Sequence, residues 1–251
     1  MSELTKFESE SIFMQSSLIP IKIIQQTPSN LGTADLKFIG LADDSHQYAL
    51  KRLADHAFLP ISEWVGYHLS RAIGLATPDF ATVWLDEQTP AFGSRLELVQ
   101  QLGLPPSLIQ IAKYFGPDLC AATEPIFAVD SFLPNDDRHA RNFLWRETAT
   151  GVLPLAFDFS RAWLIGGLPF GKFPLSENDH TIQMWRYLKS TFSYTRPEVP
   201  MRKIVELPDD WLEMVFDLAP HQWLDGFDIK STIDFWKTQR KARCNAALEM
   251  L

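Results

Sequence analysis

Asn135-Asp136-Asp137-Arg138-His139-Ala140-Arg141-Asn142 and, shortly after it, Phe157-Asp158-Phe159-Ser160 are the most informative parts of this sequence. Between them, residues 143–146 and 152–157 are rich in apolar side chains, and residues 148–151 form a segment that ends in Gly. Apolar runs on either side of such a segment are typical of two strands joined by a tight turn. The sequence therefore predicts a β-hairpin between the two quoted stretches.

The register of this hairpin determines which side chains meet at its open end. If Glu147 faces Val152 across the turn, Asn142 faces Phe157. We therefore expect Asn142 and Asp158 to lie close together where the two strands separate.

Asp137 precedes the hairpin by one short loop, so Asp137, Asn142 and Asp158 form a set of oxygen ligands. Such a set suits Mg²⁺, which takes one or two protein oxygens and leaves its other positions to water and phosphate oxygens. Phosphoryl transfer uses a carboxylate that accepts the hydroxyl proton, and an Asp and an Asn on the metal ions that bridge the phosphates. The pattern thus favours phosphoryl transfer.

The pattern Asn-x-Asp-Arg-His-x-x-Asn over residues 135–142, followed by Asp158 at the end of a strand, resembles the HipA-like kinases. Phosphatidylinositol kinases have a similar Asp-Arg-His-x-x-Asn. The Arg and His follow the Asp here, which reverses the His-Arg-Asp order of ordinary protein kinases. The resemblance runs from about Ile21 to about Leu168 and is strongest between Asp130 and Ser160.

This resemblance implies an α+β, two-lobed, protein-kinase-like fold. Residues 1–99 would form an N-terminal antiparallel sheet lobe with one helix, and residues 100–251 a mainly helical lobe. The implied cofactors are ATP and Mg²⁺. Asp137 would be the catalytic base, and Asn142 and Asp158 would bind the metal.

A three-stranded meander is predicted over residues 21–26, 35–41 and 47–53. In kinases the third strand of such a meander carries the Lys that contacts the phosphates. Lys51 takes that place, and by strand alternation it faces inward with Ala49, where it needs a partner.

Residues 60–74 read as a helix that begins near a Pro and ends at a Gly. Glu63 on this helix is the expected partner of Lys51, in the position of the acid on kinase helix C. The alternative is that Glu63 lies in the first turn and only complements the helix dipole.

Ser29 and Asn30 lie in the first turn of the meander, which lacks a G-x-G-x-x-G pattern. HipA-like kinases use Ser and backbone amides there, so the resemblance implies that both residues bind nucleotide, although an ordinary hairpin turn explains them equally well. Further strands are predicted over 80–85 and 91–98. By resemblance the adenine lies near residues 95–99, which makes Glu97 a nucleotide-binding candidate.

The C-terminal part reads as helices over residues 105–114, 119–132, 180–191, 208–218 and 229–250. Residues 159–178 have the length and position of an activation segment but lack the Ala-Pro-Glu ending of protein kinases. Trp residues are scattered along the chain and are interpreted as packing anchors.

Composition limits the function classes. With 46% hydrophobic and 22% charged residues in 251, the chain is ordinary for a globular protein, and its formal net charge of -8 argues against a generic nucleic-acid surface. We identify no signal peptide and no transmembrane run, which favours a cytoplasmic location. Cys120 and Cys244 lack metal-ligand spacing and are interpreted as incidental thiols.

His139 lies beside Asp137 and is a further catalytic candidate, as a general base or, more in keeping with its position, as a residue that orients the loop. His68, His180 and His221 appear isolated in the sequence. A metal-dependent hydrolase built from Asp137, His139 and Asp158 is the rival chemistry, but it leaves Lys51 without a role.

Three hypotheses follow: a HipA-like kinase that phosphorylates a protein Ser or Thr, a kinase acting on a small molecule or lipid head group, and a pseudokinase that binds nucleotide or a partner without turnover. The chain is shorter than the full-length HipA toxins, so a toxin role or a DNA-bound partner is not carried over. ATP and an unidentified acceptor are the expected partners.

Overall fold

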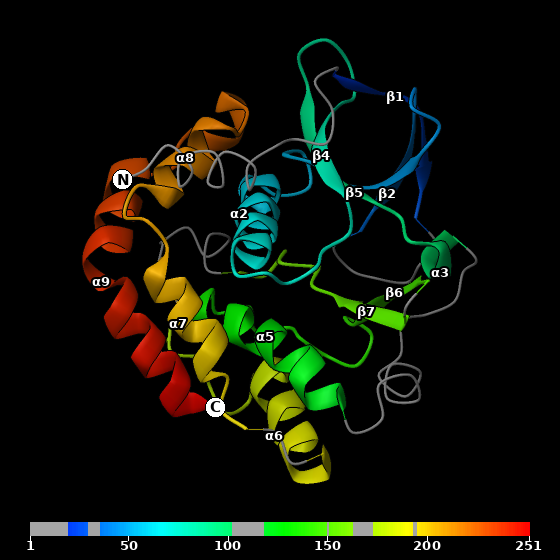
Figure 1. Ribbon diagram of the computed structural model, residues 1–251. Coiled ribbons are helices and arrows are strands. Elements are labelled where there is room, and N and C mark those ends of the chain that lie inside the picture. Colours follow the sequence, from blue (N-terminus) through cyan, green and yellow to red (C-terminus); the bar gives the residue numbers. More distant parts are fainter. Residues whose placement is uncertain (1–19, 30–35, 102–117, 150, 163–172, 193–194) are drawn as a thin grey trace.

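The computed structural model describes residues 20–29, 36–101, 118–149, 151–162, 173–192 and 195–251. It contains a five-stranded sheet, a separate hairpin and a group of helices, so the fold class is α+β as predicted. Figure 1 shows the sheet on one side of the molecule, the C-terminal helices on the other, and α2 (Leu59–Ala72) between them. The boundary between residues 99 and 100 stays a prediction, as does the division into two lobes.

The five strands of the sheet follow the predicted order of elements: β1 (Ile21–Pro28), β2 (Phe38–Ala42), β3 (Gln47–Lys51), β4 (Phe80–Trp84) and β5 (Pro90–Arg95). The first three form the predicted antiparallel meander. The sheet then closes on itself in the order β1-β2-β3-β5-β4, because β1 also pairs with β4 in parallel. This closure was not predicted from the sequence, since it joins strands that are distant in the chain.

Helix α2 begins and ends as its sequence predicts, with Pro60 in the first turn. After the helix, Gly74 has φ +85° and donates its N–H to Arg71 O, and Leu75 donates to Ser70 O. These two bonds form a Schellman motif, whose left-handed residue favours Gly. Because α2 starts at Leu59, Glu63 lies beyond the first turn, and the helix-dipole alternative for Glu63 is wrong.

Helix α5 (Leu119–Phe132) and the long helix α9 (Ile229–Met250) have the predicted boundaries. Helices α6 (His180–Phe192) and α8 (Trp211–Asp217) match the predictions for 180–191 and 208–218 within a few residues. The predicted helix 105–114 lies outside the described residues. Three short helical elements were not predicted from the sequence: α3 (Leu98–Gln101), α7 (Glu198–Glu206) and the 3-10 helix η2 (His221–Leu224).

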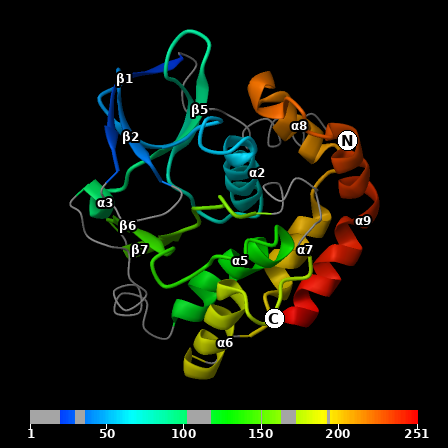
Figure 2. The ribbon, with the colours of Figure 1, turned by 180° about the vertical axis from the view of Figure 1, so that it is seen from behind.

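The hairpin consists of β6 (Leu144–Thr148) and β7 (Gly151–Leu155). Glu147 pairs with Val152, which confirms the predicted register. The hairpin lies near α3 and below the sheet, on the side opposite α8 (Figure 2). Its open end is therefore directed toward the region between α2 and α5.

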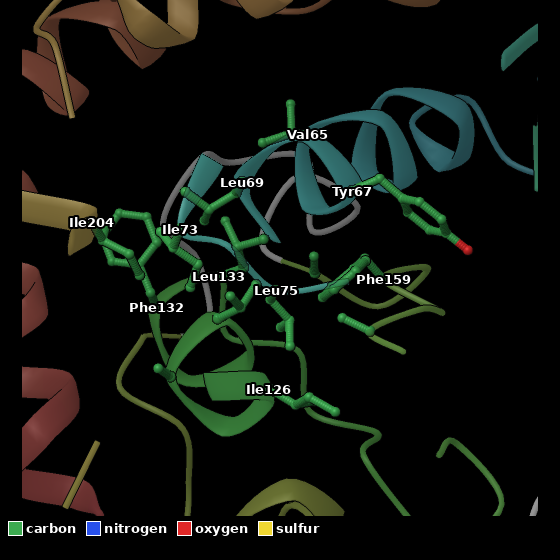
Figure 3. Packing of buried hydrophobic residues seen from close by; sticks show 14 of the residues in the cluster. Val65, Tyr67, Leu69, Ile73, Leu75, Ile126, Phe132, Leu133, Phe159 and Ile204 are labelled. Carbon is green, nitrogen blue, oxygen red and sulfur yellow. The ribbon is translucent and has the colours of Figure 1, made fainter. Parts of the chain in front are cut away.

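One large core joins α2, α5 and the C-terminal helices, and a smaller one fills the closed sheet. In Figure 3, Leu69 of α2 lies above and Ile126 of α5 below, and Leu75 and Phe159 lie between the two helices. Trp64 and Trp223 are buried and donate their indole N–H groups to Val215 O and Pro90 O, so the packing interpretation of these tryptophans is confirmed. Within the described ranges, no helix has the length and apolar character needed to cross a membrane.

Candidate active site

Lys51, Glu63 and Asp158 form a buried charged group that joins β3, α2 and the segment after the hairpin. Lys51 Nζ lies 3.3 Å from Glu63 Oε1 and 3.2 Å from Asp158 Oδ1. The exposed fractions of these side chains are 8%, 1% and 17%, so Asp158 is the most open of the three. The expected ion pair between Lys51 and Glu63 is therefore present, and Asp158 joins it.

Ser160 connects all members of this group through one hydroxyl. Its Oγ accepts from Lys51 Nζ at 2.5 Å and lies 2.7 Å from Glu63 Oε1 and 2.8 Å from Asp158 Oδ1. A hydroxyl carries one proton, so it donates to one carboxylate at a time while it accepts from the ammonium. We refer to Lys51, Glu63, Asp158 and Ser160 as the lysine cluster.

The two carboxylates of the lysine cluster respond differently to burial. Burial raises the pKa of Glu63 above its ordinary value of 4.5, and the attraction of Lys51 offsets this only in part. Burial also acts to raise the pKa of Asp158, but the attraction of Lys51 and the hydrogen bond from Ser160 outweigh it, so the pKa is lowered from 3.8. Asp158 is therefore the carboxylate that stays ionised most readily.

Helix α2 holds the segment that carries Asp158. Phe159 N–H donates to Glu63 Oε2 at 3.0 Å, and Ser62 Oγ donates to Phe159 O at 2.6 Å. The Phe159 ring lies against Gly66, where an added Cβ would come within 2.3 Å of a ring carbon. Gly66 thus lets the Phe159 ring approach α2 more closely than any larger residue at this position would allow. The backbone of the preceding residue, Asp158, is held in the left-handed region at φ +60°.

A second buried pair, Asp130 with Arg138, supports the catalytic loop (residues 135–142). Arg138 Nε lies 2.7 Å from Asp130 Oδ2, Nη2 lies 2.9 Å from Oδ1, and both side chains are fully buried. Burial alone would lower the pKa of Arg138, but the attraction of Asp130 outweighs it and the pKa is raised. Arg138 therefore braces the Asp130 carboxylate beneath the catalytic loop.

The same arginine joins the catalytic loop to the end of the hairpin. Arg138 Nη1 donates to Asn142 O at 2.5 Å and to Phe157 O at 2.8 Å. Asn135 adds a second link, because its Nδ2 donates to Asp130 Oδ1 at 2.8 Å and to Asp158 O at 3.2 Å. The loop and the residues before Phe159 are therefore fixed relative to each other.

The Asn142 amide is oriented by a hydrogen bond within the catalytic loop. Its Nδ2 donates to Asp137 O at 2.8 Å, which leaves the amide oxygen, the atom that would bind a cation, outside this hydrogen bond. Within the described part of the chain, no group of three or more His, Cys, Asp or Glu side chains is placed to hold a metal ion. The oxygen ligands that Asn142 and Asp158 offer are of the kind that Mg²⁺ takes together with nucleotide phosphates, and metal binding by these two residues stays a prediction.

Asp137 lies at the surface end of the catalytic loop, with 27% of its side chain exposed. Its Oδ1 is 2.7 Å from His180 Nδ1, and its Oδ2 is 3.7 Å from Arg161 Nε. His139 Nδ1 accepts the N–H of Arg141 at 3.2 Å, a contact within the loop. His139 therefore contributes a contact to the geometry of the loop, and its role as a general base or an orienting residue stays a prediction.

The predicted nucleotide-binding residues are only partly described. Ser29 follows β1 and donates its N–H to Lys37 O, whereas Asn30 lies outside the described residues. Glu97 forms a two-bond ion pair with Arg146 of β6, with distances of 2.6 and 3.0 Å. These contacts join the segment after β5 to the hairpin. Nucleotide binding by the three residues stays a prediction.

Sequence reasoning assigned no role to Ser160 or His180. Ser160 stands two residues after Asp158, a spacing that would have suggested proximity. His180 is distant from Asp137 in the sequence and appeared isolated, because the contact depends on how α6 packs against the catalytic loop.

No protein-family profile matches the chain, and no curated protein matches it in sequence. Among solved structures, the proinflammatory kinase CtkA of Helicobacter pylori is similar, with a TM-score of 0.55 and 15% identity over 92% of this chain and 98% of that one. A chain in the complex of the Shewanella oneidensis MR-1 toxin–antitoxin proteins HipA and HipB with operator DNA has a TM-score of 0.46 and 15% sequence identity. The match covers 97% of this chain and 69% of that one. The likeness to CtkA establishes the fold of this chain. The resemblance to kinases predicted from the sequence is thus confirmed at the level of the fold.

Proposed function

We propose that this chain is an ATP- and Mg²⁺-dependent kinase of the HipA-like type, with two lobes that meet near residue 99. It transfers the γ-phosphoryl group to a hydroxyl, and the favoured acceptor is a Ser or Thr of a protein. The observation that carries the proposal is the lysine cluster, in which Lys51 contacts both Glu63 and Asp158 within 3.3 Å. Kinases use a Lys paired to a helix Glu, together with a metal-binding Asp, to hold ATP.

Asn142 and Asp158 would hold Mg²⁺ together with the phosphates. When bound, Mg²⁺ supplies neutralisation of the negative charge that develops on the phosphoryl oxygens. Lys51 would contact the phosphates, and Glu63 would keep the ammonium directed toward them. Glu63 suits this role because it is buried and also holds the Phe159 backbone.

Asp137 would act as the catalytic base. Its carboxylate is partly exposed and belongs to the same loop as Asn142, so it is accessible to an acceptor hydroxyl beside the γ-phosphate. Asp137 would accept the hydroxyl proton as the acceptor oxygen forms its bond to phosphorus and the bond from phosphorus to ADP breaks.

The decisive experiment is Asp137→Asn, assayed with radiolabelled ATP and Mg²⁺, with and without cell extract. The variant should bind ATP with nearly unchanged affinity, while kcat falls by roughly 10²–10⁴-fold, as is typical when a positioned base is lost. Asp136→Asn is the matched control and should keep most of the activity. Equal kcat in wild type and Asp137→Asn would overturn the assignment of the base.

The fate of the label separates the remaining alternatives. Label in protein supports the favoured acceptor, and label in a small molecule or lipid identifies a different kinase. Label found only in free phosphate would indicate the hydrolase built from Asp137, His139 and Asp158. Nucleotide binding without any turnover of the wild type would indicate a pseudokinase.

A further inference from the structure

The N-terminus of α6 is fastened to the catalytic loop by Thr181. Its Oγ1 donates to Asn135 O at 2.5 Å and accepts the N–H of Arg138 at 2.9 Å. Its own N–H donates to Asp136 O at 3.4 Å, and the side chain is fully buried. These three contacts hold the helix end and the loop in one arrangement.

His180 precedes Thr181 and makes the contact to Asp137. The His180 side chain is 60% exposed, so it contributes little to the core, and its Nδ1 lies 2.7 Å from Asp137 Oδ1. An ionised carboxylate only accepts hydrogen bonds, so this contact requires a proton on Nδ1. The pairing with Asp137 therefore selects the Nδ1–H form of His180.

We propose that His180 is a positioning residue for phosphoryl transfer, an inference that rests on the proposed function. The Nδ1–H of His180 holds Asp137 Oδ1 and so fixes the rotation of the carboxylate. Oδ2 forms an ion pair with Arg161, whose Nε lies 3.7 Å away, beyond hydrogen-bond distance, so the lone pairs of Oδ2 can still accept the proton of the acceptor hydroxyl. The acceptor O–H bond breaks and its proton moves to Oδ2. His180 gains and loses no proton in this step.

The position of the donor atom makes the proposal testable. An Asn side chain places its amide N–H close to where imidazole Nδ1 lies, whereas Gln reaches the position of Nε2. His180→Asn should therefore keep the bond to Asp137 and most of the wild-type kcat. His180→Gln should lower kcat by roughly 10- to 100-fold, as expected when a reacting group loses its alignment, with little change in the KM for ATP.

The controls separate positioning from folding. His46 forms a comparable exposed pair with Asp44, with Nδ1 3.3 Å from Oδ2, and His46→Gln should leave kcat unchanged. Urea unfolding should show similar stability for wild type, His180→Asn and His180→Gln, since the exposed imidazole packs little.

Three outcomes decide the matter. Lower kcat in His180→Gln with recovery in His180→Asn supports positioning. Equal kcat in wild type and both variants overturns it, as does an equal loss in both variants, because the amide N–H in His180→Asn would then fail to replace the Nδ1–H donor. Failure of the proposed function is distinct, since the wild type itself would then transfer no phosphoryl group.

Discussion

Asp130 with Arg138 and the lysine cluster are both buried charged groups, but their charges balance differently. The Asp130–Arg138 pair has one carboxylate and one guanidinium, both fully buried and joined by two short hydrogen bonds. The second has one ammonium and two carboxylates, and one carboxylate, Asp158, is 17% exposed. The first pair is closed to ligands, while the second carries excess negative charge at an accessible position.

This difference indicates different tasks. A buried charge is costly unless it is paired, so a neutral and fully bonded pair suits a permanent frame. Excess negative charge beside an accessible carboxylate is relieved by a further cation, which suits a metal brought in with nucleotide. Asp130 and Arg138 therefore support the catalytic loop, whereas the lysine cluster is the part proposed to receive ligand.

The largest expected effect is on the frame. Arg138→Met removes the partner of Asp130 and leaves a buried carboxylate without its counter-charge. Such losses typically cost 3–5 kcal/mol, so the free energy of unfolding in urea should fall by about that much. The double variant Asp130→Leu with Arg138→Met should regain part of it, because the uncompensated charge is gone.

Arg186 provides the matched control for this prediction. It pairs with Glu177 at 2.9 Å, but both side chains are exposed, at 53% and 81%. Arg186→Met should therefore change stability by at most about 1 kcal/mol. If Arg138→Met were equally mild, the two buried groups would not differ as described.

The next effect concerns cation binding by the lysine cluster. Asp158→Asn removes the accessible negative charge and keeps a residue that tolerates the left-handed φ of +60°, which Ala tolerates less well. Calorimetry should show ATP binding that no longer responds to Mg²⁺. Asp137→Asn is the control and should keep the wild-type response. An unchanged Mg²⁺ response in Asp158→Asn would remove the metal assignment.

Local patterns in the sequence were sufficient to predict the hairpin and part of the lysine cluster. The hairpin register follows from turn chemistry, and the pairing of Glu147 with Val152 agrees with it. Lys51 on an inward strand face required an acid, and Glu63 was the candidate at the right place in the order of elements.

Tertiary contacts between distant segments could not be predicted in this way. The parallel pairing of β1 with β4 depends on the path of the whole sheet. Gly66 appeared to be an ordinary helical residue, because its need for a missing Cβ arises only when Phe159 packs on it. His180 became relevant only through the docking of α6 by Thr181.

The smallest expected effect is a pH dependence that distinguishes Glu63 from the other acids. Burial raises its pKa above 4.5, so the folded chain holds this proton at a higher pH than the unfolded chain does. Ionisation of Glu63 therefore opposes folding. Its cost is absent below about pH 4.5 and grows as the pH rises toward the folded-state pKa.

Glu63→Gln keeps the shape of the side chain and removes this titration, so its stability relative to wild type should improve as the pH rises above about 4.5. Asp158 does not obscure the change, because its pKa is lowered from 3.8 and lies beneath this range. Urea midpoints measured from about pH 4 to about pH 8 test the prediction. Glu177→Gln should show no such gain, since Arg186 lowers the pKa of that exposed carboxylate. A flat or falling difference for Glu63→Gln would mean that Lys51 compensates Glu63 fully, and the lysine cluster would then resemble the balanced pair of Asp130 and Arg138.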